Sequence, residues 1–202
     1  MNSSTLSNYY RLHAPIYDAT RWSFLLGRKE LIQKILRLPN KEHVLELGSG
    51  TSWLLQRCLE QDAKTHYTGV DLSEDMVALS RKKLVKFGNM SLRCESILDH
   101  NPIHKYDLIY ASYSLSMMTS IYDSLFIKLR DILAENGRIF IVDFYKSPST
   151  LFKKWMGFNH VNFLSNHIKR LQLHFHISEI QRTKVYFGLW EYALIELKAK
   201  KL

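Results

Sequence analysis

Cysteine, proline and glycine are scarce in this sequence, with 2, 4 and 8 residues among 202. Cys58 and Cys94 fall in a predicted helix and a predicted strand, so we expect small buried thiols rather than a disulfide, which suits a reducing compartment. No apolar run reaches the roughly 18 residues of a membrane span, and the first residues lack the basic and apolar regions of a secretory signal. We therefore expect the protein to be cytoplasmic.

Internal repeats, low-complexity tracts and flexible linkers are also missing. At about 150 residues per domain, a chain of 202 residues corresponds to one domain with at most a modest appendage. Hydrophobic residues make up 46% and charged residues 23% of the chain, which is ordinary for a globular protein and excludes intrinsic disorder. We expect a single domain with one continuous fold.

Positive charge is concentrated at both ends of the chain, and the net charge is +9. Lys and Arg outnumber Asp and Glu by 7 to 3 in residues 1–43 and by 9 to 3 in residues 151–202, whereas residues 44–150 have 12 against 13. Basic ends attract anionic partners, which include nucleic acid, acidic small molecules and the anionic face of a membrane. A basic surface that only serves solubility is an equally open interpretation.

Short apolar runs alternate with helical patterns along most of the chain. Five runs predict strands, at 43–47, 67–72, 90–94, 106–111 and 138–144. Helices are predicted after residue 52, after the N-cap residue Ser73, and over 122–133. This alternation predicts an α/β fold, a Rossmann-like, doubly wound and mostly parallel sheet with helices on both faces. Two last runs, 183–187 and 190–197, predict an antiparallel hairpin that turns at Gly188.

A glycine loop follows the first predicted strand, and an acidic residue ends the second. Gly48 and Gly50 stand where the backbone must turn sharply and let a ligand approach without a Cβ in the way. Asp71 follows Gly50 by 21 residues, which is the position where a carboxylate accepts hydrogen bonds from ribose hydroxyls. In a doubly wound sheet the ligand site lies at the carboxyl ends of these strands. Together the loop and the carboxylate indicate a nucleoside ligand.

Two common nucleotide sites are excluded by residues that this loop does not have. The dinucleotide fingerprint requires a third glycine where this sequence has Trp53, which is too large for close helix packing beneath a pyrophosphate. There is no Gly-Lys-Ser or Gly-Lys-Thr, so a phosphate-binding P-loop is absent. Glu46, just before the loop, would repel a phosphate but would accept a hydrogen bond from a cationic amino-acid group.

The order of strand, glycine loop, helix, strand and acid over roughly residues 40–145 resembles the class I S-adenosylmethionine-dependent methyltransferases. The resemblance implies S-adenosylmethionine as cofactor and S-adenosylhomocysteine as product. It divides the chain into a helical cap (1–40), a cofactor-binding core (41–145) and substrate-side helices with closing strands (146–202). The positions that it assigns to the cofactor are Glu46, Gly48, Ser49, Gly50 and Thr51 at the methionine part, Asp71 at the ribose, Leu72 and Met76 at the adenine face, Ser96 and Ile97 after the third strand, and Ser112 after the fourth. Many members have an acid near the adenine amine where this chain has Ser96, with Glu95 and Asp99 nearby.

Two further stretches are similar to bacterial lipid-headgroup N-methyltransferases, such as those acting on diacylglyceryl homoserine or phosphatidylethanolamine. They are Tyr9-Tyr-Arg-Leu-His13 with Ile16-Tyr-Asp-Ala-Thr-Arg-Trp-Ser-Phe-Leu-Leu-Gly-Arg28, and Ser112-Tyr-Ser-Leu-Ser-Met-Met118. The C-terminal stretch Gly188-Leu-Trp-Glu-Tyr192 also aligns. The resemblance implies a lipid amine as substrate and a peripheral position at the inner face of the membrane.

Transfer of a methyl group to an amine requires positioning, exclusion of water and loss of the amine's proton. We expect Tyr17 and Tyr113 to assist as catalytic residues, with Asp18 in reserve. Aromatic faces hold methylated ammonium groups by cation–π attraction. Tyr9, Tyr10 and Trp22, together with Ser114, are therefore the expected substrate contacts. Packing of these aromatic side chains on the core is the alternative interpretation.

The region after the fifth strand combines apolar and basic residues at helical spacing. Leu151, Phe152, Trp155 and Met156 are expected on one helical face, opposite Lys153 and Lys154. Such a segment lies in a membrane interface or packs on a protein core. The 9 histidines are scattered without acids at ligand spacing, so we expect no metal.

The sequence thus predicts an S-adenosylmethionine-dependent N-methyltransferase acting on a lipid headgroup amine. A small-molecule or quinone-precursor methyltransferase and a non-catalytic S-adenosylmethionine-binding module are the alternatives. An RNA methyltransferase is disfavoured, because the Asn/Asp-Pro-Pro-Tyr/Phe motif is absent after the fourth strand, and nucleic acid is not an expected partner. The oligomeric state is left open by the sequence.

Overall fold

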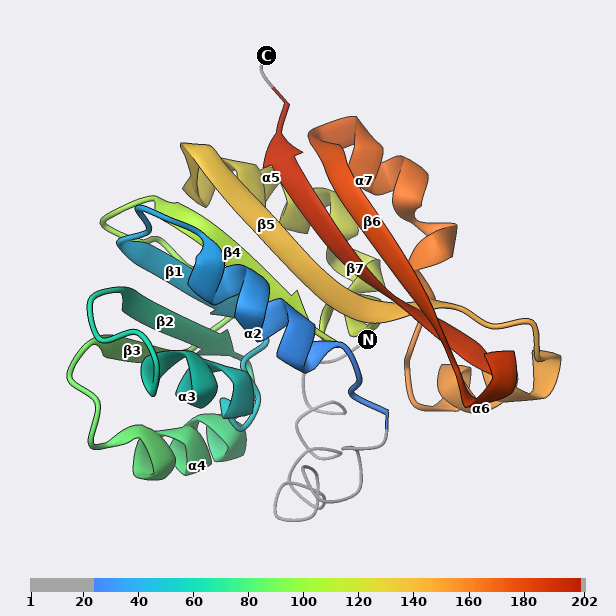
Figure 1. The fold of residues 1–202 in the computed structure, drawn as a ribbon, viewed down its shortest axis with the longest axis horizontal. Coiled ribbons are helices and arrows are strands. Elements are labelled where there is room, and N and C mark those ends of the chain that lie inside the picture. The colour runs from blue at the N-terminus through green and yellow to red at the C-terminus, as the bar shows by residue number, and fades with distance from the viewer. Residues whose placement is uncertain (1–23, 201–202) are drawn as a thin grey trace.

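The structure is a computed structural model that describes residues 24–200. These residues form a seven-stranded sheet with helices on both faces (Figure 1). The strand order is β3-β2-β1-β4-β5-β7-β6. The strands are β1 (His43–Leu47), β2 (His66–Asp71), β3 (Met90–Cys94), β4 (Tyr106–Ser112), β5 (Leu133–Lys146), β6 (Phe175–Val185) and β7 (Trp190–Ala199). The helices are α2 (Arg28–Arg37), α3 (Trp53–Leu59), α4 (Glu74–Leu84), α5 (Tyr122–Ile132), α6 (Thr150–Phe158) and α7 (Ile168–His174). Short 3-10 turns are η1 (Leu115–Met117), η2 (Thr119–Ile121), η3 (Leu164–Asn166) and η4 (Tyr186–Gly188).

Strands β1 to β5 run parallel to one another. Strand β7 lies between β5 and β6 and runs antiparallel to both. The central strand β1 is apolar on both faces, and Val44, Leu45 and Leu47 are fully buried because helices cover each side. One face packs on α2, α3 and α4, and the other on α5 and α7, which Figure 1 shows in front of and behind the sheet. The predicted α/β fold with its closing hairpin is therefore confirmed.

Several predicted details of the fold differ from the structure. β5 begins at Leu133 rather than at residue 138, and its register against β4 shifts between Tyr106 and Leu108. Gly137 allows this irregular pairing, because a Cβ there would lie 2.8 Å from the Leu133 side chain and 2.9 Å from the Tyr106 carbonyl oxygen. Cys94 is exposed instead of buried, since β3 is an edge strand, whereas Cys58 is buried as expected; both thiols are free.

The predicted apolar face of the segment after β5 is divided between core and solvent. Phe152 and Met156, four residues apart on α6, are buried, whereas Leu151 and Trp155 point outward with exposures of 79% and 49%. Residues one helical position apart differ by about 100° in direction, so the core accommodates only one of the two pairs. Within residues 24–200, no helix has the length and apolar character needed to cross a membrane.

A partly buried carboxylate network lies at the end of the sheet opposite the carboxyl ends of the strands. Asp62, in the loop before β2, accepts hydrogen bonds from Thr65 Oγ1 at 2.8 Å and Tyr67 Oη at 3.2 Å. Lys41, just before β1, pairs with the same carboxylate at 2.9 Å. Burial raises the pKa of Asp62, but the hydrogen bonds from Lys41 and Thr65 outweigh it and lower this pKa to about 2.

We expect Asp62→Asn to lower the free energy of unfolding at pH 7 by about 1–2 kcal/mol, allowing for solvent screening. The folded-state pKa lies below the unfolded value, so this stabilisation is complete above about pH 4 and is lost as the pH falls towards 2. Urea unfolding of both proteins across this pH range measures the difference. Asp131→Asn, at an exposed site on α5, is the matched control and should change stability little. A constant difference between wild type and Asp62→Asn from pH 7 to pH 2 would contradict the assignment.

Candidate functional site

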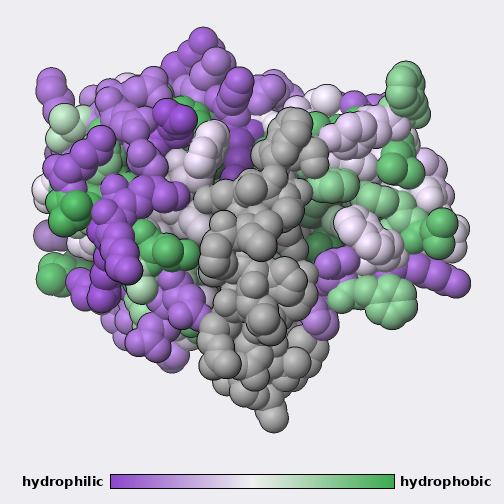
Figure 2. Space-filling view, turned by 90° about the horizontal axis from the view of Figure 1, so that it is seen from below, coloured by the Kyte–Doolittle hydropathy of each residue, from purple (hydrophilic) through white to green (hydrophobic). Residues whose placement is uncertain are grey.

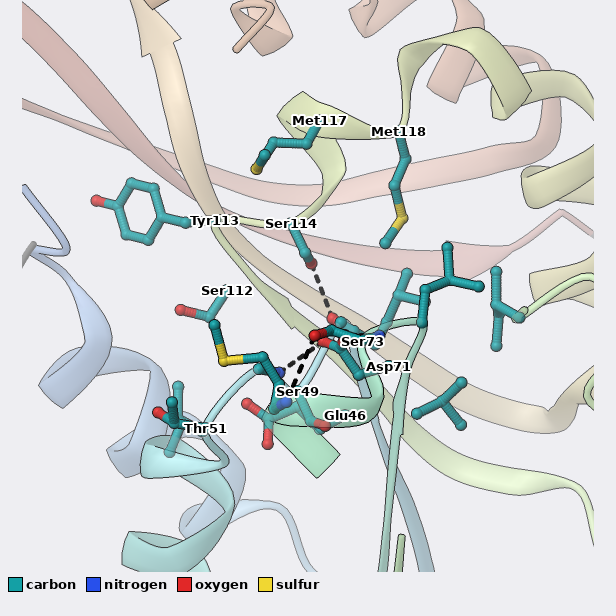
Figure 3. Close-up of a pocket in the computed structure, with 18 of the residues that line it drawn as sticks. Glu46, Ser49, Thr51, Asp71, Ser73, Ser112, Tyr113, Ser114, Met117 and Met118 are labelled. Carbon is teal, nitrogen blue, oxygen red and sulfur yellow. Dashed lines mark hydrogen bonds between the residues drawn. The ribbon is translucent and has the colours of Figure 1, made fainter. Parts of the chain in front are cut away.

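A cavity of about 430 Å³ opens at the carboxyl ends of β1, β2 and β4 (Figure 3). It is lined by the loops that follow these strands and by the start of α2. The predicted site residues Glu46, Gly48, Ser49, Gly50, Thr51, Asp71, Leu72, Met76, Ser96, Ile97, Ser112, Tyr113 and Ser114 all line this cavity. The predictions Tyr9, Tyr10, Tyr17, Asp18 and Trp22 lie outside the described residues.

The loop after β1 has a backbone that favours glycine at two positions. Gly48 and Gly50 have φ angles of 67° and 52°. At Gly48 a Cβ would lie 2.6 Å from Cβ of Ser114, so this glycine lets the loops after β1 and β4 touch. At Gly50 a Cβ would meet no protein atom within 4 Å and would point into open space. Gly48 is therefore required by the fold, whereas Gly50 leaves room for a ligand.

Asp71 connects the end of β2 to the glycine loop. Its carboxylate accepts hydrogen bonds from the Gly50 backbone N–H at 2.7 Å and from the Ser73 backbone N–H at 2.9 Å. Burial raises the pKa of this carboxyl, and the two backbone donors act in the opposite direction. Figure 3 shows Asp71 between the loop and the start of α4. A carboxylate oxygen accepts more than one hydrogen bond, so Asp71 also has capacity for ribose hydroxyls.

Glu46 is a buried acid beneath the glycine loop, with an exposure of 3%. The Tyr110 hydroxyl and the Leu55 backbone lie close enough to this carboxyl to lower its pKa by hydrogen bonding, although Oε2 makes no hydrogen bond of ordinary geometry; Ser49 Oγ has no partner among the described residues. Burial raises the pKa of Glu46 to about 8, although the positive charge of Arg28 opposes the shift. Arg28, the first residue of α2, donates from Nε to Ser112 Oγ at 2.9 Å. Glu46 and Ser49 therefore present polar groups to the cavity that are available to a polar ligand.

The loop after β4 forms the other end of the cavity. Tyr113 has a φ angle of 56°, which is unusual for a bulky residue, and its hydroxyl donates to the Leu26 carbonyl oxygen at 2.7 Å. Burial raises the pKa of Tyr113 well above its ordinary value, so the phenol stays neutral. This geometry favours positioning of residues 24–28 over action as a base. Ser114 donates to the Leu47 carbonyl oxygen at 2.8 Å, and the wall is completed by Met117, Met118 and Ile121.

An acid lines the cavity at the end of β3, next to the expected site residues Ser96 and Ile97. Glu95 lines the cavity directly after β3, and His100 Nδ1 lies 2.6 Å from Glu95 Oε1. Ser96, the residue that stands where many members of the family have an acid, accepts a hydrogen bond at Oγ from the Leu98 backbone N–H at 3.2 Å. An acid immediately after the third strand was the available signal for Glu95. No local pattern in the sequence indicated Arg28, because its hydrogen-bond partner Ser112 is 84 positions away.

A metal centre is not part of this site as far as the structure describes it. Within residues 24–200, no group of three or more His, Cys, Asp or Glu side chains could hold a metal ion. The charged side chains of the cavity are Arg28, Glu46, Asp71 and Glu95. Of the three acids, Glu46 lies at the end expected for the amino-acid part of the ligand, and Asp71 and Glu95 lie at the end expected for the nucleoside.

Comparisons with known proteins agree with this geometry. Residues 45–139 match the family model described as a methyltransferase domain. Malonyl-[acyl-carrier protein] O-methyltransferase of Priestia megaterium is 29% identical over 127 residues, which cover 62% of this chain and 46% of the relative. Trans-aconitate 2-methyltransferase of Acidovorax sp. is 32% identical over 108 residues, covering 54% and 40%. The chain thus spans somewhat less than half the length of these curated relatives.

Solved structures share the fold over nearly the whole chain. N-methyltransferase NodS from Bradyrhizobium japonicum, in complex with S-adenosylhomocysteine, has a TM-score of 0.75 at 15% identity and covers 96% of this chain and 98% of its own. The 1,6-didemethyltoxoflavin-N1-methyltransferase of Burkholderia thailandensis, also with S-adenosylhomocysteine, has 0.75 at 16%, covering 98% and 89%. The [4+2]-cyclase SpnF has 0.81 at 13%, covering 98% and 97%. The predicted fold and the resemblance of the core to class I S-adenosylmethionine-dependent methyltransferases are confirmed; the relatives' names include both O- and N-methyltransferases.

We expect Gly50→Ala to fold but to bind S-adenosylhomocysteine at least about tenfold more weakly. The added methyl meets no protein atom, so the cost to folding is the backbone strain of a positive φ, about 1–2 kcal/mol. The same methyl group would occupy the space reserved for the ligand. Isothermal titration calorimetry of the variant and the wild type, with thermal unfolding as a folding check, measures both effects. Gly88→Ala, where a Cβ also has open space but lies outside the cavity, is the control. Undiminished affinity in Gly50→Ala would place the ligand elsewhere.

Proposed function

Because residues 45–139 match the methyltransferase domain and the chain folds as class I S-adenosylmethionine-dependent methyltransferases do, we propose that this protein transfers a methyl group from S-adenosylmethionine to an amine of a lipid headgroup. The observation that carries the cofactor part is the glycine loop with open space at Gly50, which the Asp71 carboxylate holds in place beside the buried Glu46. Bound there, the cofactor supplies a methyl group on a positively charged sulfur. The chain's residues bind it, orient the acceptor and exclude water.

Each end of the cavity suits one part of the cofactor. Glu46 faces the α-ammonium, and Arg28, held by Ser112, lies near enough to Glu46 to neutralise a carboxylate on the same amino acid. Asp71 accepts hydrogen bonds from the ribose hydroxyls while it keeps the Gly50 backbone in place. Met76 and Ile97 line the cavity with buried apolar side chains and would provide apolar contacts for the adenine ring.

The acceptor end of the cavity favours a nucleophile that needs no strong base. Met117, Met118 and Ile121 form its wall, and no Lys, His or Cys is among the described lining residues. A phenol or alcohol must lose its proton to attack, whereas a neutral amine attacks with its lone pair and releases its proton afterwards. Apolar surroundings disfavour the charged ammonium form, so the same wall helps to keep the amine neutral.

The surroundings of the cavity support a lipid as the carrier of that amine. Asn162, in the segment after α6, donates its backbone N–H to the Ser116 carbonyl oxygen at 2.9 Å, so the C-terminal part borders the acceptor loop. Residues 151–202 carry 9 basic against 3 acidic residues, which favours the anionic surface where such headgroups occur. O-methylation of a malonyl-type substrate is the second candidate, favoured by the relative from Priestia megaterium.

We expect labelled methyl groups to pass from S-adenosylmethionine to an amine lipid in mixed micelles, with phosphatidylethanolamine and diacylglyceryl homoserine as the substrates offered. The extracted lipids, separated by chromatography, report the product. Malonyl-acyl carrier protein and free ethanolamine are assayed in parallel. Methylation of malonyl-acyl carrier protein with none of either lipid would replace the proposal by the second candidate. Binding of S-adenosylhomocysteine with no turnover on any acceptor would favour a non-catalytic binding module.

We expect the affinity for S-adenosylhomocysteine to rise between pH 6 and pH 8. The pKa of Glu46 is about 8 in the free protein, so the carboxyl is largely protonated at neutral pH and must lose its proton to bind an ammonium. Binding should therefore release a proton, which calorimetry in buffers of different ionisation enthalpy detects. Glu46→Gln should remove the pH dependence and weaken binding at pH 8 by about 1–3 kcal/mol. Glu60→Gln, at an exposed site just after α3, is the control. A pH dependence that persists in Glu46→Gln would assign the proton to another group.

A further inference from the structure

Exposed apolar side chains gather where α6 meets the turn between β6 and β7. Leu151 and Phe158 on α6 are 79% and 83% exposed, Trp155 is half exposed, and Phe187 in the turn is fully exposed. Figure 2 shows hydrophobic side chains on the side of the molecule that carries α6 and this turn, with hydrophilic ones dominating the opposite side. We call these four residues, with the neighbouring lysines Lys146, Lys153, Lys154 and Lys184, the tip surface.

The tip surface is held in place by buried contacts. Ser147 donates from Oγ to the Leu189 carbonyl oxygen at 2.6 Å and accepts from the Ser149 backbone N–H at 3.1 Å, which ties the start of α6 to the turn. Ser149 in turn caps α6 by accepting from the Phe152 backbone N–H at 3.2 Å. Phe152 packs inward, in the same cluster of buried residues as Trp190 of β7. The outward residues of α6 are therefore displayed by a helix whose other face is anchored.

The turn presents its aromatic residue at a conformational cost. Tyr186 and Phe187 have φ angles of 49° and 57°, in the left-handed region that bulky side chains disfavour. Phe187 gains no burial in return, since its side chain is fully exposed. Strained backbone that displays an unburied aromatic side chain is a feature of functional surfaces.

Lysines outnumber acids around these apolar residues. From residue 144 to residue 178 the sequence has no acid, while Lys146, Lys153 and Lys154 lie in this stretch and Lys184 follows in β6. Glu179, the first acid after it, is paired with Lys34. An open groove of about 580 Å³ beside Phe187 is lined by Lys146, Lys184 and Glu191 among others. Two lysines against one acid leave the groove cationic and suited to a phosphate headgroup.

The tip surface lies at the same edge of the sheet as the candidate cofactor site. β5 runs parallel to β4 and ends at Lys146, so the turn that follows it lies on the side of the sheet where the carboxyl ends of β1, β2 and β4 lie. Phe24 lies 5.9 Å from Trp155 between ring centroids, and two residues later Leu26 accepts the hydrogen bond from Tyr113 in the cavity. Residues 24–28 therefore run directly from the tip surface to the cavity, where Arg28 lines the wall.

We propose that the tip surface docks the protein on an anionic lipid bilayer, with Phe158, Phe187 and Leu151 entering the interface and the lysines contacting lipid phosphates. The proposal rests on the proposed function, in which the acceptor amine belongs to a lipid. Protruding aromatic and aliphatic side chains among lysines are the pattern that peripheral proteins insert into the headgroup region. A protein partner takes its anchors in apolar pockets, whereas the apolar side chains of the tip surface protrude and have lysines beside them.

The test is sedimentation of the full-length chain with vesicles of phosphatidylglycerol mixed with phosphatidylcholine, and with vesicles of phosphatidylcholine alone. We expect at least about tenfold stronger binding to the anionic vesicles, since each lysine near the surface contributes roughly a fivefold increase. The variant Lys153→Glu with Lys154→Glu should reduce binding to the anionic vesicles at least about tenfold. The variant Phe158→Ser with Phe187→Ser should do the same through the loss of buried apolar area.

Matched controls come from equally exposed residues elsewhere on the molecule. Lys64→Glu with Lys82→Glu makes the same change in net charge, and Val85→Ser with Ile103→Ser replaces apolar residues that are 80% and 95% exposed. Neither control should change vesicle binding by more than about twofold. Reduction by the charge control equal to that of the lysine variant would mean that net charge alone attracts the protein, and would overturn the proposal.

Other results would also overturn it. No sedimentation of the wild type, or equal sedimentation of the wild type and both tip variants, excludes this surface as the docking site. Binding of purified acyl carrier protein that is lost in the tip variants, without vesicle binding, would assign the surface to an acidic protein. Calorimetry with S-adenosylhomocysteine on the same samples separates the two proposals. Retained cofactor binding without vesicle binding rejects only the tip surface, whereas vesicle binding without cofactor binding rejects the proposed function.

Discussion

The hydrogen bond from the Gly50 backbone N–H to Asp71 fixes the geometry on which the rest of the site depends. The parallel pairing of β1 and β2 brings Leu47 opposite Val70, so both strands end together and their following loops meet. The Val70 carbonyl oxygen accepts from Gly48 and Ser49 backbone N–H groups at 2.9 and 3.1 Å, which extends the strand pairing into the loop. From the outside, α4 holds the same loop through Ser80 Oγ, 3.0 Å from the Gly50 carbonyl oxygen. A loop fixed on both sides loses little further entropy on binding a ligand.

This fixed loop surrounds an acid whose burial is costly without a partner. Glu46 lies under the loop with its pKa raised, and the neighbouring Arg28 belongs to α2, on a different part of the chain. A cationic amino-acid group bound beside Glu46 would offset that cost, so the ligand completes the electrostatics of the core. The fold alone does not decide the reaction, because the [4+2]-cyclase SpnF has the highest TM-score of the neighbours compared above. The glycine loop held by Asp71 and the cavity that it borders, rather than the likeness of fold, carry the case for S-adenosylmethionine.

Local patterns in the sequence predicted the core of the fold and the cofactor side of the site, because those features depend on residues close together in the chain. Ser73 as an N-cap and the glycine loop with Asp71 follow from spacing and turn chemistry, and the structure contains both. Arg28 could not be predicted in the same way, since it reaches Ser112 across 84 positions of sequence. The outward direction of Leu151 and Trp155 was missed because amphipathic spacing alone does not say which of two adjacent helical rows meets the core.

The antiparallel strand β7 affects how a substrate would reach the cavity. Because β7 inserts between β5 and β6, the hairpin turn is brought to the edge of the sheet where the parallel strands end. Ser147 then joins the turn to α6, and Asn162 after α6 joins the acceptor loop through Ser116. A membrane-docked tip surface would therefore stand beside the acceptor end of the cavity, on a continuous path of hydrogen-bonded segments. A headgroup amine would reach the cavity from the interface while its acyl chains stay in the bilayer, which avoids the cost of extracting a whole lipid into water.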